Sequence, residues 1–133
     1  MNPHYLSVVF ISRSLPAKLP HEFIVVTAWN PMDEILDQAI NARRNLRLQE
    51  RIRESGHEFW ELTGASPDLS HMEPGFLTNA SKKKGRRWMS LFKQRAFYHV
   101  LGDELILLPT EKKEPPMAMG SFRKRLIQEE ITG

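Results

Sequence analysis

The chain has 133 residues and a hydrophobic content of 41%, which suits one domain with a packed core. It contains no cysteine, and this excludes disulfides, thiolate metal sites and cysteine nucleophiles. The net charge is only +3. No apolar run approaches the ~18 residues of a membrane helix, and the N-terminus lacks the features of a signal peptide, so we expect a cytoplasmic protein with no membrane partner.

Two strands and a long helix are predicted for the first part of the chain. Residues 5–12 (YLSVVFIS) are rich in β-branched side chains, and residues 23–29 (FIVVTAW) have the continuous apolar character of a strand covered on both faces. Pro31 ends this strand because proline cannot donate a ladder hydrogen bond. A helix is expected from Asp33, as its N-cap, to Ser55. Its apolar residues share a face: Ile35, Leu36, Ala39, Ile40, Ala42 and Leu46.

Four further strands and a second helix are predicted after residue 56. Residues 58–63 (EFWELT) alternate between polar and apolar side chains as a half-buried strand does, and residues 75–78 form a short strand. The second helix begins at Ser81. Residues 96–108 are predicted to form a β-hairpin around a Gly-Asp turn.

This order of elements predicts an α+β fold. The simplest architecture is a mixed, mainly antiparallel sheet with two helices on one face, and a ferredoxin-like variant is one such arrangement. Residues 1–108 are expected to form this single domain. Residues 109–133 are expected to be a peripheral tail with a short helix over residues 121–131.

The stretch SPDLSHMEPGF, residues 66–76, has the most chemical character. It places Asp68, His71 and Glu73 within six residues, and a histidine between two carboxylates can act as a general acid or base. The same residues are possible ligands of a divalent metal, but the spacing matches no metalloenzyme signature, so we expect no cofactor. Asn30, at a strand end, could position a substrate. All four residues are also typical of turns and strand ends, and the sequence favours that structural interpretation.

Basic residues cluster in the second helix. No acid lies between residues 82 and 95, where seven lysines and arginines occur. Such a segment is typical of a surface that binds nucleic acid or another polyanion, although charged helix faces are also often only solvated. The candidate anion-binding residues of the two helices are Lys82, Lys83, Lys84, Arg86, Arg87, Arg43, Arg47 and Arg51.

Three functional hypotheses follow from these segments. The leading one is a non-enzymatic module that binds a phosphate-rich partner, such as nucleic acid or a nucleotide, through the basic helix. The second is a small hydrolase or transferase that uses Asp68, His71 and Glu73, with Asn30 positioning the substrate. The third is a protein–protein inhibitor or immunity-type factor with a protein partner.

Five short motifs occur in a fixed order between residues 23 and 108. They are TAWNP (27–31), SPD (66–68), HxEPGF (71–76), QxAFY (94–98) and GDEL (102–105). Together they resemble the bacterial family catalogued as domain of unknown function 3293. The resemblance implies a single-domain protein of bacterial or phage origin, and it implies no activity. It also implies a glycine-containing helix end before Gln94, where this chain has Phe92-Lys93, and a less basic segment than KKKGRR.

Overall fold

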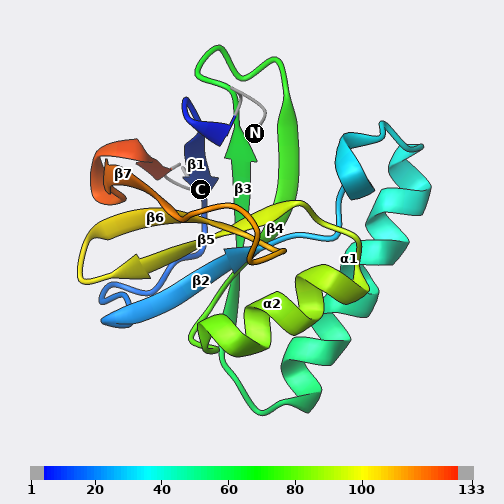
Figure 1. Cartoon of the computed structure of the whole chain (residues 1–133). Coiled ribbons are helices and arrows are strands. Elements are labelled where there is room, and N and C mark those ends of the chain that lie inside the picture. Colours follow the sequence, from blue (N-terminus) through cyan, green and yellow to red (C-terminus); the bar gives the residue numbers. More distant parts are fainter. Residues whose placement is uncertain (1–4, 129–133) are drawn as a thin grey trace.

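The computed structural model describes residues 5–128, which form one eight-stranded sheet and two α-helices (Figure 1). Neither helix in this part of the chain is long and apolar enough to cross a membrane. In chain order the elements are β1 (Val9–Ser12), β2 (Glu22–Val26), α1 (Gln38–Glu54), β3 (Phe59–Ala65), β4 (Met72–Thr78), α2 (Lys82–Leu91), β5 (Ala96–Leu101), β6 (Glu104–Pro109), β7 (Met117–Ser121) and β8 (Leu126–Gln128).

The centre of the sheet has the ferredoxin-like arrangement. Its four middle strands lie in the order β5-β2-β4-β3 and all pair antiparallel, with α1 joining β2 to β3 and α2 joining β4 to β5. Strands β6 and β7 extend one edge and β1 and β8 extend the other, where β1 and β8 pair in parallel. The predicted α+β fold with a mixed, mainly antiparallel sheet is therefore confirmed.

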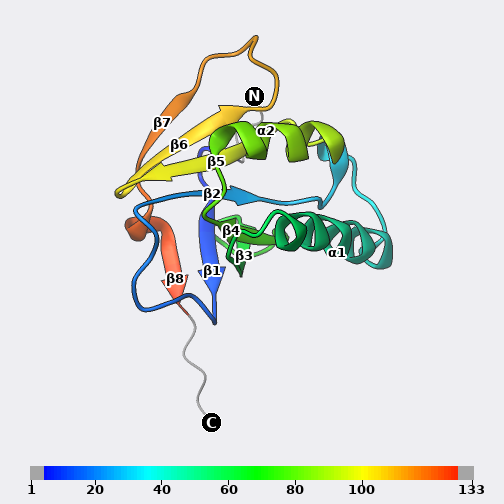
Figure 2. The ribbon, with the colours of Figure 1, turned by 90° about the horizontal axis from the view of Figure 1, so that it is seen from below.

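Both helices cover the same face of the sheet, as predicted (Figure 2). Strand β2 is buried on both faces because its side chains alternate between two apolar clusters. Ile24 and Val26 belong to the cluster beneath the helices, whereas Phe23 and Val25 belong to the cluster on the other face. The helices contribute Leu48, Ile52, Trp88 and Met89 to the first of these clusters.

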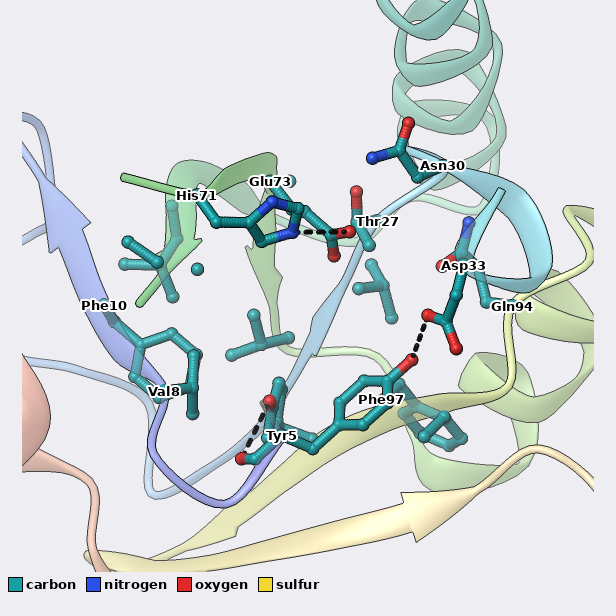
Figure 3. Close-up of a pocket in the computed structure, with 18 of the residues that line it drawn as sticks. Tyr5, Val8, Phe10, Thr27, Asn30, Asp33, His71, Glu73, Gln94 and Phe97 are labelled. Atoms are coloured by element: carbon teal, nitrogen blue, oxygen red, sulfur yellow. Dashed lines mark hydrogen bonds and ion pairs between the residues drawn. The ribbon is translucent and has the colours of Figure 1, made fainter. Parts of the chain in front are cut away.

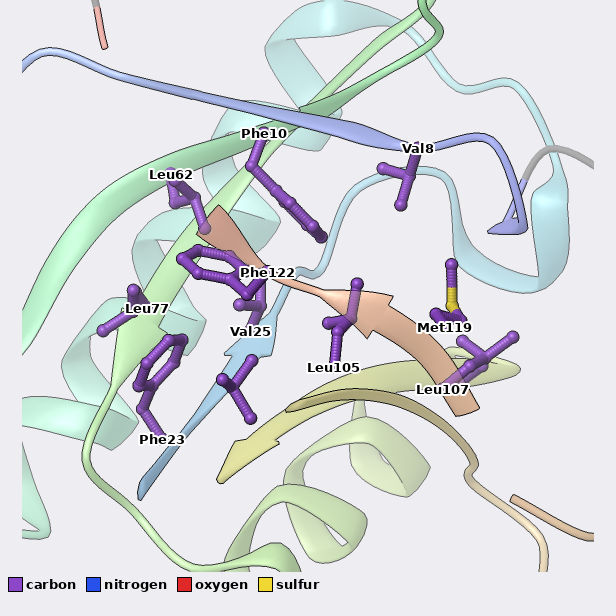
Figure 4. Packing of buried hydrophobic residues seen from close by; sticks show 12 residues of the cluster. Val8, Phe10, Phe23, Val25, Leu62, Leu77, Leu105, Leu107, Met119 and Phe122 are labelled. Carbon is purple, nitrogen blue, oxygen red and sulfur yellow. The ribbon is translucent and has the colours of Figure 1, made fainter. Parts of the chain in front are cut away.

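The second cluster fills the concave side of the curled sheet (Figure 4). Phe122 closes it: its ring lies 5.2 Å from the ring of Phe10 and 5.1 Å from that of Phe23, measured between centroids. Phe122 is almost wholly buried, and strands β7 and β8 on either side of it pair with β6 and β1. The segment predicted to be a peripheral tail is thus part of the sheet and its core.

Of the short helix expected over residues 121–131, the described part contains a 3-10 helix at Arg123–Arg125, which is followed by strand β8. The remaining residues of that prediction lie outside the described chain. The concave apolar face of the sheet requires a cover, and Phe122 with Met119 provides it. This cover was not predicted because Phe122 and Met119 stand among charged and small residues in the sequence.

Helix α1 begins later than expected and buries a different face. Its N-cap is Asp37, whose side chain accepts a hydrogen bond from the Ala39 N–H at 2.7 Å, whereas Asp33 lies in a preceding turn. The residues that α1 buries are Asn41, Asn45, Leu48 and Ile52. The predicted apolar face points outward instead, and the exposed fractions are 44% for Ile40 and 57% for Leu46.

Helix α2 packs closely on the sheet at Gly85. A Cβ atom at this position would lie 2.7 Å from the Phe97 ring and 2.8 Å from the Ile24 Cδ1 atom, so only glycine fits. The helix ends in a Schellman motif, in which Lys93 N–H donates to the Ser90 carbonyl and Gln94 N–H donates to the Met89 carbonyl. Lys93 adopts a φ of 57°, so it occupies the left-handed position where the family resemblance implies a glycine.

We predict that Phe122→Ala lowers the free energy of unfolding by about 3–5 kcal/mol, because it opens a cavity in the concave cluster. Lys124→Ala, an exposed change two residues away, should alter it by less than about 0.5 kcal/mol. Chemical denaturation of both variants measures the difference. Equal stability of the two variants would show that the segment after Pro109 does not contribute to the core.

Candidate functional site

A cavity of about 340 Å³ opens at the end of the sheet where β2 and β3 finish and where β1, β4 and β5 begin (Figure 3). Its volume lies at the lower end of the roughly 300–1,000 Å³ typical of small-molecule sites. Its floor is apolar and includes Val8, Phe10, Val25, Leu62, Ala96, Phe97 and Tyr98. Its polar lining includes Tyr5, Thr27, Asn30, Asp33, His71, Glu73 and Gln94.

The cavity exists because the chain leaves the sheet after Val26. The backbone of the next residues loses its strand partners, and side chains from α1 replace them. The Asn45 Oδ1 atom accepts the Ala28 N–H at 2.9 Å, and the Asn45 Nδ2 group donates to the Pro74 carbonyl at 2.8 Å. The Arg44 Nε group donates to the Ala28 carbonyl at 2.8 Å. Helix α1 therefore ties the exit of β2 to the beginning of β4.

Asn30 and Asn41 form a second, reciprocal connection. The Asn30 N–H donates to Asn41 Oδ1 at 2.9 Å, and the Asn41 Nδ2 group donates to Asn30 Oδ1 at 2.8 Å. The same Asn30 oxygen accepts the Leu36 N–H at 3.1 Å. Asn30 is held in the left-handed region at φ 46°, a conformation that asparagine tolerates better than most residues. We call Asn30, Asn41 and Asn45 the asparagine latch.

The end of α2 holds the same loop from the other side. The Gln94 Nε2 group donates to the Trp29 carbonyl at 3.1 Å, and the Met32 N–H donates to the Lys93 carbonyl at 2.8 Å. Met32 and Asp33 also have positive φ values, of 51° and 62°. Such conformations cost about 1–3 kcal/mol each and persist only where surrounding contacts impose them. The loop is therefore fixed in one conformation by both helices.

Two carboxylates reach the cavity from different segments (Figure 3). Asp33, on the loop, accepts a hydrogen bond from the Tyr5 hydroxyl at 3.0 Å and lies 3.1 Å from the Arg95 Nε atom, so each of its oxygens has a partner. Glu73, on β4, has a side chain that is only 27% exposed. Its Oε1 atom lies 3.4 Å from the Nε2 atom of His71, whose side chain is half-exposed.

Burial raises the pKa of Glu73, and His71 opposes this shift by its charge and its hydrogen bond. The Asp33 charge adds to the increase, and the Asn30 amide reduces it. Burial also raises the pKa of the Tyr5 phenol, with Asp33 as the next cause, and that of the Tyr98 phenol, with Glu73 as the next cause. Both phenols therefore stay protonated and can donate hydrogen bonds at neutral pH.

Asp68 lies outside the cavity, in the turn between β3 and β4. Its Oδ1 atom accepts hydrogen bonds from the Ser66 hydroxyl at 2.7 Å, from the Ser70 hydroxyl at 2.8 Å and from the Ser70 N–H at 3.1 Å. These bonds lower the pKa of Asp68 to about 2. The Ser66 hydroxyl in turn accepts the His71 N–H at 3.0 Å, so Asp68 orders the turn that presents His71.

The structure thus separates the candidate catalytic residues of the sequence. Asn30, His71 and Glu73 converge on the cavity, and Asp68 does not. Among residues 5–128, no group of three histidine, aspartate or glutamate side chains is placed to hold a metal ion. Asp68, His71 and Glu73 are therefore not assembled as a three-ligand site.

The basic residues lie away from this cavity. Lys82, Lys83 and Arg87 are exposed near the beginning of α2, and none of the five cations from Lys82 to Arg87 forms an ion pair within the described chain.

On α1, Arg47 and Arg51 line a groove beside the other end of α2, and Glu50 and Glu54 line it with them. The two sets of cations thus adjoin opposite ends of α2, and the groove on α1 carries mixed charge.

Several residues of the site were not identified from the sequence. The spacing of Asn41 and Asn45 could have indicated that both are buried. They occupy positions i and i+4 of an otherwise amphipathic helix, and two polar residues one turn apart can form a buried polar stripe. Tyr5, Asp33 and Gln94 carried no such signal. The bond between Tyr5 and Asp33 spans 28 positions of the chain, so no local pattern contains it.

We predict that Glu73→Gln stabilises the protein above about pH 5 and has little effect near pH 4. The pKa of Glu73 is higher in the folded state than in the unfolded chain, where glutamate ionises near pH 4.3, so stability conferred by the native carboxyl is lost as pH rises through the folded pKa. Denaturation at pH 4 and pH 8 measures this. Glu61→Gln, at an exposed carboxylate on β3, is the matched control. A Glu73→Gln effect that is the same at both pH values would contradict the assigned burial.

The comparisons with known proteins identify a family but no activity. The model of the family described as "Protein of unknown function (DUF3293)" matches residues 26–97, more than half of the chain. This segment extends from the end of β2 into β5 and includes the asparagine latch and Glu73. No curated protein and no solved structure matches the chain. The chain belongs to the DUF3293 family.

Proposed function

We propose that this protein binds a small molecule in the cavity between the latched loop and β4. The observation that carries the proposal is the convergence of Asn30, His71 and Glu73, from a loop, a turn and a strand, on one cavity with an apolar floor. An apolar cavity with a few convergent polar groups, one of them a carboxylate with a raised pKa, is the usual form of a ligand site.

The rigidity of the loop supports the same proposal. The bonds from Asn41, Asn45 and Gln94 hold the loop in place without a ligand, so binding does not have to order it. A site that is formed in advance loses less conformational entropy on binding. The left-handed residues Asn30, Met32 and Asp33 are also of the kind that concentrates at ligand sites.

A catalytic version of the proposal would use His71 and Glu73 as a proton-transfer pair. Their side chains are 3.4 Å apart, which a substrate could close to hydrogen-bond distance. Asp68 could take no direct part in such chemistry because it lies outside the cavity and is bonded within its turn. A hydrolase or transferase would therefore need Asn30 or a phenol of the cavity, rather than Asp68, as its third group.

The binding proposal is tested by a fragment screen observed by ¹H–¹⁵N NMR. We expect fragments to shift the amide signals of Asn30, Glu73 and Tyr98, and Val8→Phe, which fills the cavity, to weaken binding at least tenfold. Val9→Phe, at the neighbouring position outside the lining, is the matched control. Dispersed spectra show that both variants fold. No fragment-induced shift at these amides, or undiminished binding by Val8→Phe, would refute the proposal.

A second candidate function, binding of a polyanion, is favoured by the exposed cations of α2 that lack ion pairs within residues 5–128. We expect duplex DNA, single-stranded DNA or RNA to bind at low salt, with a log–log salt slope of about −0.7 to −0.9 for each phosphate neutralised. The variant Lys82→Glu with Lys83→Glu should bind more weakly, and Arg123→Glu with Lys124→Glu is the control. Absence of binding at low salt, or binding that is independent of salt, would refute this candidate.

A further inference from the structure

We infer that the ligand of the cavity is an organic amine, bound as its ammonium ion, with a compact apolar body. This inference rests on the proposed function and specifies its ligand class. It follows from the charges of the lining, the partners of the two carboxylates and the side chains around them.

The charge of the cavity is opposite to that of the chain. The protein has a net charge of +3, yet none of the lysines and arginines among residues 5–128 lines the cavity, whereas two carboxylates, Asp33 and Glu73, do. Within the same described residues, His71 is the one basic side chain of the lining. An anionic ligand would be repelled by the Glu73 carboxylate in a partly enclosed, weakly polar space, and a cation would be attracted.

The two carboxylates differ in how far neighbouring groups balance their negative charge. Asp33 has a hydrogen-bond donor on one oxygen and a guanidinium on the other, so its charge is already compensated. Among residues 5–128, Glu73 has the half-exposed His71 as its one charged partner, at 3.4 Å, and the neutral Asn30 amide as a hydrogen-bond partner. A carboxylate that is removed from water and incompletely paired is costly, and a second cation offsets that cost. Glu73 is therefore the anchor for a ligand ammonium group.

The rest of the lining suits the remainder of such a ligand. Four aromatic rings border the cavity, those of Tyr5, Phe10, Phe97 and Tyr98. Aromatic faces attract ammonium ions, and their edges and the aliphatic floor accommodate an apolar body. The Tyr98 ring is fixed edge-on against Phe10 with centroids 5.2 Å apart, so this wall is rigid.

The inference also predicts how affinity changes with pH. Binding needs ionised Glu73, whose pKa is raised by burial, so affinity should increase as pH rises through that pKa and fall only when an alkylamine itself loses its proton, near pH 10. The other groups that face Glu73 are His71, 3.4 Å away, Asp33, which is paired with Arg95, and the phenols of Tyr5 and Tyr98, whose raised pKa values keep them neutral.

The test compares probes of equal shape and different charge: benzylamine, benzyl alcohol and benzoate, and cyclohexylamine with cyclohexanol. NMR titration of the wild-type protein at pH 7.5 should give amine affinities at least tenfold higher than those of the alcohols, with no detectable benzoate binding. Glu73→Gln should abolish the preference and keep the weak alcohol binding. Glu61→Gln, the exposed control, should keep the preference.

The outcomes separate this inference from the proposed function. Alcohols that bind in the cavity as tightly as amines, or an amine preference that survives Glu73→Gln, would overturn the amine inference and leave a small-molecule site in place. If none of the probes shifts the amide signals of the cavity, the amine inference is overturned. The fragment screen then tests the proposed function separately. Benzoate binding tighter than amine binding would reverse the assigned charge of the site.

Discussion

The paired hydrogen bonds between Asn30 and Asn41 are the constraint on which the rest of the site depends. The chain leaves the sheet after Val26 while it is still buried, and an unpaired buried amide or carbonyl costs about 1–3 kcal/mol. Helix α1 meets this requirement with Asn41 and Asn45, and it must then turn a partly polar face inward. The aliphatic side chains of Ile40 and Leu46 are left exposed as a consequence, while those of Leu48 and Ile52 still pack into the core.

The candidate cavity and the lysines and arginines at the start of α2 lie apart on the sheet. Strand β4 begins at the acidic cavity and ends near the basic start of α2, so these features lie at opposite ends of the strand (Figure 1). Helix α2 then returns to the cavity, where Gln94 secures the latched loop. An organic cation and a polyanion would therefore meet different ends of the molecule and would not compete for one site.

The sequence predicted the order of strands and helices because that order depends on local patterns of apolar residues and turns. The buried run of β2 and the hairpin of β5 and β6 are examples. The predictions were wrong where contacts between distant segments outweighed the local pattern. The apolar periodicity of α1 predicted the wrong buried face, because Asn41 and Asn45 of the asparagine latch must point inward. Phe122 is an isolated apolar residue, so no local pattern indicated the concave core that it closes. In the candidate site, Asn30, His71 and Glu73 were found in two short motifs, whereas Tyr5 and Asp33 meet only through the fold.

Amide hydrogen exchange of the wild-type protein tests the latch most directly. The N–H groups of Ala28 and Asn30 lie outside any strand or helix, yet they donate to buried asparagine side chains. The structure predicts that both exchange as slowly as the paired amides of β2, close to the limit set by global unfolding. Exchange at the rate of an exposed loop would contradict the latch and, with it, the preformed cavity.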